Sequence, residues 1–137
     1  MAYMNQEKKK RINIELKPIL KRYGIQGTLA VRHHSTLVLN IKAGKIDFIN
    51  NYNNLIDQKY NGQTGINIPN KAVNYLQINP YWYQDHFTGT ALSFLSEVSE
   101  IMNDGNHDNS DSQSDYFDVG WYTDINIGNW ERPYIIN

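Results

Sequence analysis

The chain of 137 residues contains no cysteine. Disulfide bonds, thiol nucleophiles and cysteine-based zinc or iron–sulfur sites are therefore excluded, and nothing requires an oxidising compartment. No apolar run approaches the length needed to span a membrane. The first residues, MAYMNQEKKKRIN, are basic but lack the apolar stretch of a secretory signal. These absences predict a protein that acts in the cytoplasm and makes no membrane contact.

Signatures of catalysis are also missing. The sequence has no phosphate-binding glycine loop, no zinc-protease helix motif and no nucleophile elbow. Asp85 could orient His86, but no serine or lysine nearby is placed as a nucleophile. His33 and His34 are adjacent, so on a strand they would point to opposite faces and could not share one ion. The sequence favours a protein that is not an enzyme and needs no cofactor or metal.

Net charge is close to zero, at −1, but its distribution is uneven. Residues 1–50 hold ten Lys or Arg against three acidic residues, a balance of +7, which leaves −8 for residues 51–137. Opposite poles of this kind either attract each other across the fold or offer one pole to a partner. So balanced a chain is neither a general nucleic-acid binder nor an acidic DNA mimic.

The most acidic segment, DGNHDNSDSQSD at 104–115, partly matches a calcium-binding EF-hand loop. Oxygen donors fall at its first, third, fifth, seventh and twelfth positions. The match fails where asparagine replaces the sixth-position glycine, where aspartate replaces the final glutamate, and where a strand pattern replaces the second helix. We predict a flexible acidic loop at about 103–115. A calcium site and a charged contact surface remain alternatives; the contact surface would use Asp104, Asp108, Asp111 and Asp115.

Two segments have helical periodicity. In the first, at about 5–23, Asn5 can cap the start and Gly24 can cap the end, while Pro18 predicts a kink or a later start. The second opens at Thr88 or Gly89 and ends near Gly105, with an apolar stripe between them.

Alternating apolar residues predict strands elsewhere. A hairpin over about 27–41 turns at His34 and Ser35, and KIDFI at 45–49 extends it into a three-stranded meander. Residues 50–70 have no sustained period and are predicted to be irregular, whereas 72–78 is a fourth strand or an anchored loop. A last strand covers about 119–127. The sequence thus predicts a single α+β domain over 1–137, with a mainly antiparallel sheet of four to five strands and two helices.

Aromatic residues are dense for a domain of this size, and most of them are expected to pack in or beside the core. Those left exposed would serve as anchors for a protein partner. The candidates for this partner-binding role are Trp82, Trp121 and Trp130.

The basic first helix suggests an alternative partner. Its positive side chains could neutralise nucleic-acid phosphates, although they are not interleaved with the aromatic residues as in a single-strand groove. The candidate residues are Lys8, Lys9, Lys10, Arg11, Lys17, Lys21 and Arg22. An edge strand of the sheet could also pair with a second copy to form a homodimer.

Four segments resemble the large polyvalent protein-associated domains of phages and mobile elements, in particular the type numbered twenty-nine. They are YMNQEKKKRI, LKPILKRYGIQGTLAVRHHSTLVLNIKAGKIDF, YWYQDHFTG and SDYFDVGWYTDINIGNWERPY, and together they span most of the chain. The likeness is one of order and character rather than of a catalytic signature, so no site residue is carried over.

The resemblance implies an accessory protein encoded by a phage or mobile element. Domains of this kind are parts of large injected proteins that are thought to protect incoming DNA or to disarm host defences. It implies that the present chain acts in the host cytoplasm. There it would bind a host defence protein and inhibit a restriction-like, BREX-like or CRISPR system without catalysis.

Overall fold

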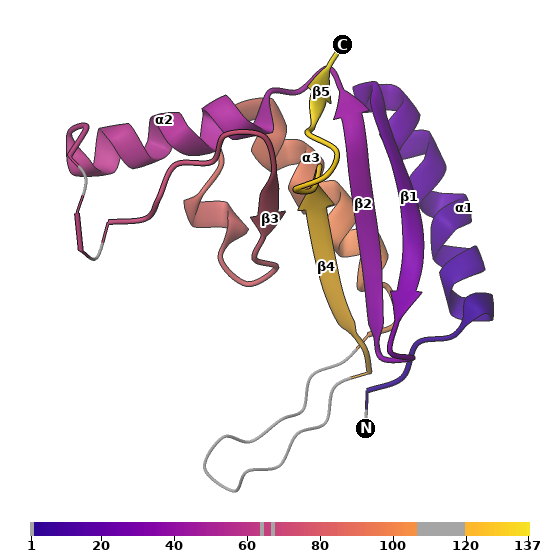
Figure 1. Ribbon diagram of the computed structural model, residues 1–137. Coiled ribbons are helices and arrows are strands. Elements are labelled where there is room, and N and C mark those ends of the chain that lie inside the picture. Colours follow the sequence, from indigo (N-terminus) through magenta and orange to yellow (C-terminus); the bar gives the residue numbers. More distant parts are fainter. Residues whose placement is uncertain (1, 64, 67, 107–119) are drawn as a thin grey trace, which may run out of the picture.

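A five-stranded mixed sheet carries three helices in the computed structural model, which describes residues 2–63, 65–66, 68–106 and 120–137 (Figure 1). The elements in chain order are α1 (Gln6–Tyr23), β1 (Ile25–Arg32), β2 (Thr36–Gly44), α2 (Phe48–Tyr60), β3 (Leu76–Ile78), the 3₁₀ turn η1 (Tyr83–Asp85), α3 (Gly89–Met102), β4 (Tyr122–Ile127) and β5 (Ile135–Ile136). The predicted α+β class is confirmed.

The sheet order is β1-β2-β4-β3, and the short β5 also pairs with β2, beyond the end of β4. The sheet is mostly antiparallel: β1 pairs with β2, and β3 with β4, in that sense. β4 and β5 run parallel to β2. β2 therefore has neighbours on both sides, whereas β1 and β3 lie at the two edges.

The first helix was predicted within one residue. The Asn5 side chain accepts a hydrogen bond from the Lys8 amide at 2.8 Å, and Gly24 ends the helix with a left-handed φ of 68°. The helix is continuous from Gln6 through Pro18, so the alternative of a later start was wrong.

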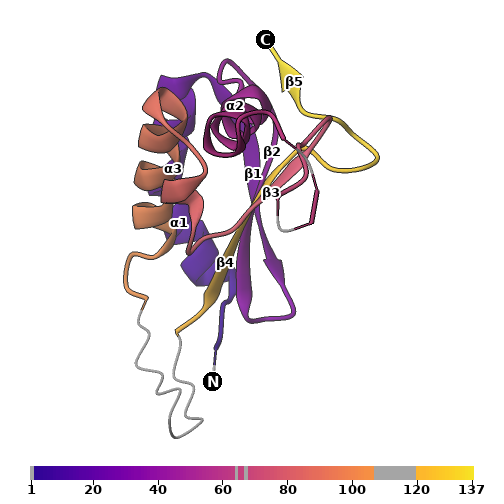
Figure 2. The ribbon, with the colours of Figure 1, turned by 90° about the vertical axis from the view of Figure 1, so that its left-hand side faces the viewer.

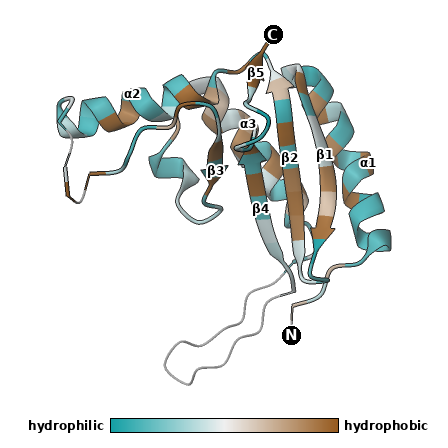
Figure 3. Cartoon of the chain, in the orientation of Figure 1, coloured by the Kyte–Doolittle hydropathy of each residue, from teal (hydrophilic) through white to brown (hydrophobic). Residues whose placement is uncertain are grey.

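α1 and α3 lie side by side on one face of the sheet, as the edge-on view in Figure 2 shows. Each turns an apolar stripe toward the strands, which is the arrangement that buries most apolar area. The side chains that meet between these layers include Leu16, Leu20, Leu29, Leu37, Leu39, Ile41, Phe94, Leu95, Val98, Ile125 and Ile127. The strands are accordingly the most hydrophobic ribbons in Figure 3.

The predicted hairpin is formed by β1 and β2, but it turns at His33 and His34, one residue earlier than predicted. Both histidines have positive φ, 54° and 55°, and the Ser35 amide donates to the Arg32 carbonyl at 3.2 Å. A two-residue turn with positive φ at both central positions is the type that suits the twist of a hairpin. This type normally carries Asn-Gly, so the two histidines hold an unfavourable backbone conformation.

The predicted third strand of the meander, at 45–49, was wrong. Asp47 caps a helix there by accepting the Asn50 amide at 3.0 Å, and α2 continues to Tyr60 through part of the stretch predicted to be irregular. The alternation of Ile46 and Phe48 was read as a strand, but Phe48 begins the helix and is fully buried. α2 extends sideways from the end of the sheet (Figure 1).

The last strands are shorter than predicted. The segment 72–78 contributes only β3, and β4 starts at Tyr122, with Ile125 and Ile127 buried as expected. Val119 lies outside the described residues. β5 was not predicted. Among the residues that the structure describes, no helix has the length and apolar character needed to cross a bilayer.

We predict that replacing His33 and His34 by Asn and Gly stabilises the protein by about 1 kcal/mol, because both residues then adopt left-handed backbone without strain. Urea unfolding measures the change. The matched control is His33→Ala with His34→Ala, which removes the imidazoles and keeps the strain, and should give no gain. Destabilisation by Asn-Gly would contradict this assignment of the turn.

A polar cluster ties the end of α1 to α3. The Arg22 guanidinium and the Tyr23 hydroxyl both donate to the Glu97 carboxylate. These hydrogen bonds lower the pKa of Glu97, and the bond from Tyr23 has the larger effect. They also raise the pKa of Tyr23 and that of Arg22.

This cluster predicts a pH dependence of stability. Because folding lowers the pKa of Glu97, this carboxylate adds to the free energy of unfolding at pH values above its usual pKa. The added stability is lost as the pH falls through the lowered pKa. Glu97→Gln should therefore be less stable than the original protein at neutral pH, and the difference should shrink in acid. Thermal unfolding across this pH range is the measurement, and Glu100→Gln, at an exposed position of the same helix, is the control.

Candidate functional site: a groove on the helix-free sheet face

One face of the sheet carries no helix in Figure 2. The side chains that point to this face are set by the alternation of β1, β2 and β4, since their neighbours point into the core. They are mostly polar and form rows across the strands, as the pairing of Thr28 with Asn40 and of Asn40 with Asn126 shows. We call this surface the open face. The residues from these three strands are Thr28, Ala30, Arg32, Thr36, Val38, Asn40, Tyr122, Asp124 and Asn126.

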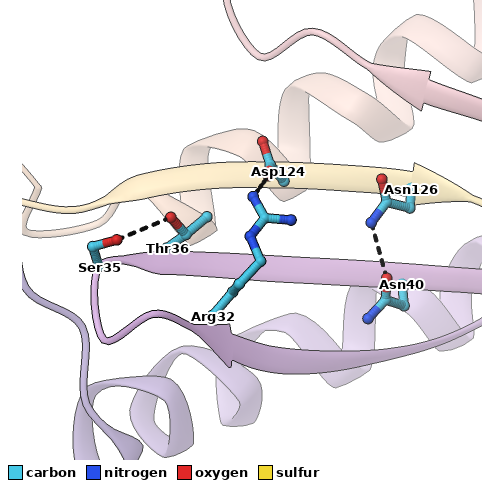
Figure 4. Close-up of polar contacts among 6 residues, drawn as sticks. All are labelled: Arg32, Ser35, Thr36, Asn40, Asp124 and Asn126. Carbon is cyan, nitrogen blue, oxygen red and sulfur yellow. Dashed lines mark hydrogen bonds and ion pairs between the residues drawn. The ribbon is translucent and has the colours of Figure 1, made fainter.

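An ion pair spans the open face. Arg32 on β1 reaches across β2 to the carboxylate of Asp124 on β4 (Figure 4). The side chain of Asp124 is only 19% exposed, whereas that of Arg32 is 46% exposed. Thr36 and Val38 on the intervening strand are buried even though no helix covers them. The stem of Arg32 accounts for this burial, because it crosses β2 at their level.

Further polar contacts connect the open face. The Asn126 amide donates to the Asn40 side-chain carbonyl at 3.0 Å, and the Ser35 and Thr36 hydroxyls lie 3.3 Å apart (Figure 4). Side chains held in this way lose little further freedom when a ligand binds. The face is thus a preorganised set of hydrogen-bonding groups.

A groove of about 510 Å³ lies at the end of the open face near the β1–β2 turn. The start of β4 and the segment that follows β3 provide two exposed tyrosines, Tyr122 and Tyr81, which are 43% and 67% exposed. The lining residues are Arg32, Thr36, Gln77, Ile78, Asn79, Pro80, Tyr81, Tyr122, Thr123 and Asp124.

A second hollow, of about 370 Å³, lies along the edge strand, next to the groove. Gln77 lines both, and Val73 and Tyr75 line the second hollow. Residues 73, 75, 77, 79 and 81 are all exposed, while the alternate residue Ile78 is buried. Within the strand itself, the side chain of Gln77 therefore faces solvent while that of Ile78 points into the core.

The chemistry of this surface suits a protein ligand. Tyrosine provides a large contact area with few rotatable bonds, and asparagine, glutamine and threonine provide adaptable hydrogen bonds. Protein interfaces are enriched in aromatic residues and arginine and depleted in lysine and glutamate. The lining of the groove has this composition, and its two charged groups already neutralise each other.

The three predicted tryptophan anchors have different environments. Trp82 and Trp130 are exposed, at 57% and 77%, and stay available to a partner. Trp121 is only 6% exposed, and its indole N–H donates to the Met102 carbonyl at 2.9 Å. It belongs to the core and does not meet the condition of exposure.

The acidic segment is described only at its start. Asp104 is exposed just after α3 and lines a hollow of about 360 Å³ beside α1. The Asn106 side chain exchanges two hydrogen bonds with the main chain of Trp121, at 2.8 and 2.9 Å, so it is engaged within the fold. Asp108, Asp111 and Asp115 lie outside the described residues, as does most of the EF-hand-like match.

The basic residues predicted on the first helix divide into two groups. Lys8 places its ammonium 5.3 Å from the centre of the Trp121 ring, and Arg22 pairs with Glu97. Lys9 is half-buried. The remaining members of the set are exposed; they are Lys10, Arg11, Lys17 and Lys21.

The histidines that were weighed as candidates lie apart from any cluster of ligands. His86 packs edge-on against Tyr52, with ring centres 5.7 Å apart. Within the described ranges, no three His, Asp or Glu side chains lie close enough together to hold a metal ion.

Comparison with models of known protein families gave no match, and comparisons with curated proteins and with solved structures gave none either.

The groove was only partly visible in the sequence. Tyr81 and Tyr122 belong to the dense aromatic set, but Arg32 and Asp124 are 92 residues apart and nothing local links them. The sequence feature that indicates this surface is the set of polar residues that alternate with the apolar residues of the strands. Thr28, Arg32 and Asn40 interrupt apolar runs at positions that all share one face.

We predict that Arg32 and Asp124 are coupled by about 0.5 kcal/mol, a value reduced by solvent because the arginine is nearly half exposed. A double-mutant cycle with Arg32→Gln and Asp124→Asn measures it by urea unfolding. The coupling should weaken as salt is added. If the changes in the free energy of unfolding caused by the two substitutions simply add at low salt, the pairing is contradicted.

Proposed function

We propose that this chain is an accessory protein of a phage or mobile element that binds a host defence protein through the open face and inhibits it without catalysis. It acts in the host cytoplasm. The observation that carries the proposal is the groove, in which two exposed tyrosines flank a neutralised arginine–aspartate pair and a set of amide side chains.

The size of the open face is consistent with a protein partner. The groove and the hollow along the edge strand have Gln77 in both of their linings, so they lie next to each other and offer a partner two neighbouring depressions. Tyrosine anchors set in a polar surface are typical of the residues that dominate binding energy in protein complexes.

The class of partner comes from the resemblance to polyvalent protein-associated domains, whose proposed task is the disarming of host defences. A protein that inhibits by occupying a surface needs shape and hydrogen-bond complementarity, but no reacting group. The open face offers these properties. The nature of the defence, whether restriction-like, BREX-like or CRISPR, is decided by experiment.

We predict that hosts carrying these defences one at a time will lose protection against phage when they express the protein. Phage plating efficiency is the measurement. The defence whose protection is lost identifies the target system, and undiminished restriction in every host would contradict the proposal.

We further predict that Tyr81→Ala with Tyr122→Ala weakens binding to that target by roughly thirtyfold, the effect of losing about 2 kcal/mol of anchor energy. Defence should then be restored. Tyr60→Ala at the far end of α2 is the matched control and should inhibit like the original protein. Thermal unfolding checks that the variants are folded. Full inhibition by the double variant would exclude the groove as the binding surface.

A further inference from the structure

Helix α1 presents a row of lysines away from the sheet. Successive residues of a helix advance by about 100°, so Lys10, Lys17 and Lys21 fall within an arc of about 40°. Ile12, Leu16 and Leu20 are buried, and their row is centred about 120° around the helix from these lysines. We call Lys10, Lys17 and Lys21 the lysine stripe. The outer surface of α1 is strongly hydrophilic in Figure 3.

The lysine stripe carries uncompensated charge. No ion pair or cation–π contact joins any of its members to a residue that the structure describes. By contrast, Arg22 on the same helix is paired with Glu97, and Arg32 and Lys71 are paired elsewhere. Within the part of the chain that the structure describes, the fold thus pairs three cations with carboxylates and none of the three lysines of the stripe.

The composition of the stripe distinguishes between classes of partner. Lysine is depleted in protein interfaces, which favour aromatic side chains and arginine. Phosphate contacts in nucleic acid, in contrast, come largely from lysine and arginine and require no apolar anchor. The only exposed apolar side chain along the stripe is Ile14, and single exposed apolar residues are normal on protein surfaces.

We propose that the lysine stripe binds the phosphate backbone of nucleic acid, independently of base sequence. The net charge of −1 does not make the whole chain a nucleic-acid binder, so the proposed binding is local to this row of cations. The stripe spans about eleven residue steps from Lys10 to Lys21, or about 17 Å along the helix axis, which is long enough to contact several phosphates of one duplex. Arg11 is also exposed, but it lies about 100° around the helix from the centre of the stripe. This site lies on the helical side of the sheet, whereas the groove lies on the open face, so one molecule can hold nucleic acid and a protein partner together.

The proposal predicts a specific dependence on salt. The logarithm of the binding constant falls linearly with the logarithm of the salt concentration, with a slope of about −0.9 for each phosphate that is neutralised. Three lysines that each neutralise one phosphate therefore contribute about −2.7 to this slope. The experiment uses a short fluorescein-labelled DNA duplex of random sequence, with fluorescence anisotropy measured over a range of salt concentrations.

The test variant carries Lys10→Gln, Lys17→Gln and Lys21→Gln, which keep good helix propensity at exposed positions. We expect its affinity at low salt to fall by about tenfold or more and the salt slope to fall by about 2.7. The control carries Lys42→Gln, Lys59→Gln and Lys71→Gln, an equal change of charge away from α1, and should bind like the original protein.

Three outcomes overturn the proposal: retained binding and slope in the test variant, an equal loss in the control, or binding to polyglutamate as tight as binding to the duplex. The last result would assign the stripe to acidic proteins instead. The proposed inhibition is tested separately, because Tyr81→Ala with Tyr122→Ala should leave duplex binding unchanged.

Discussion

The parallel pairing of β2 with β4 is the constraint on which the rest of the fold depends. Two parallel neighbours cannot be joined by a tight turn, so the chain must cross from one end of the sheet to the other between them. This crossover contains α2, β3 and α3. It brings α3 against α1 on one face and places β3 at the far edge, next to β4. The sheet thereby acquires one face covered by helices and one open face.

This division separates two kinds of surface chemistry. The open face combines tyrosines, amides and an internally neutralised ion pair, which are suited to a protein ligand. The outward face of α1 has lysines without partners among the described residues, which are suited to phosphate. The core between the sheet and the helices separates the open face from the outward face of α1. Under the two proposals made above, one molecule would bind a defence protein and DNA at the same time.

Trp121 illustrates why local patterns mislead at the end of an element. Its sequence context allowed either core packing, which was expected for most of the aromatic residues, or an anchor role if the ring were exposed. In the fold, its indole bonds to the end of α3, the Asn106 amide holds its main chain, and the Lys8 ammonium covers its ring. All three contacts join residues at least 15 positions apart, so no window of neighbouring residues contains them.

The sequence by itself determined the elements whose stability is local. Asn5 and Gly24 bound α1, period-two alternation marks the hairpin and β4, and the stripe of α3 marks its buried side, because capping and amphipathicity act over one or two turns. Only the tertiary structure decided which strands are neighbours and what lies opposite each side chain. The helical rather than extended state of Phe48, the burial of Trp121 and the meeting of Arg32 with Asp124 all depend on contacts across the sheet, which sequence periodicity does not encode.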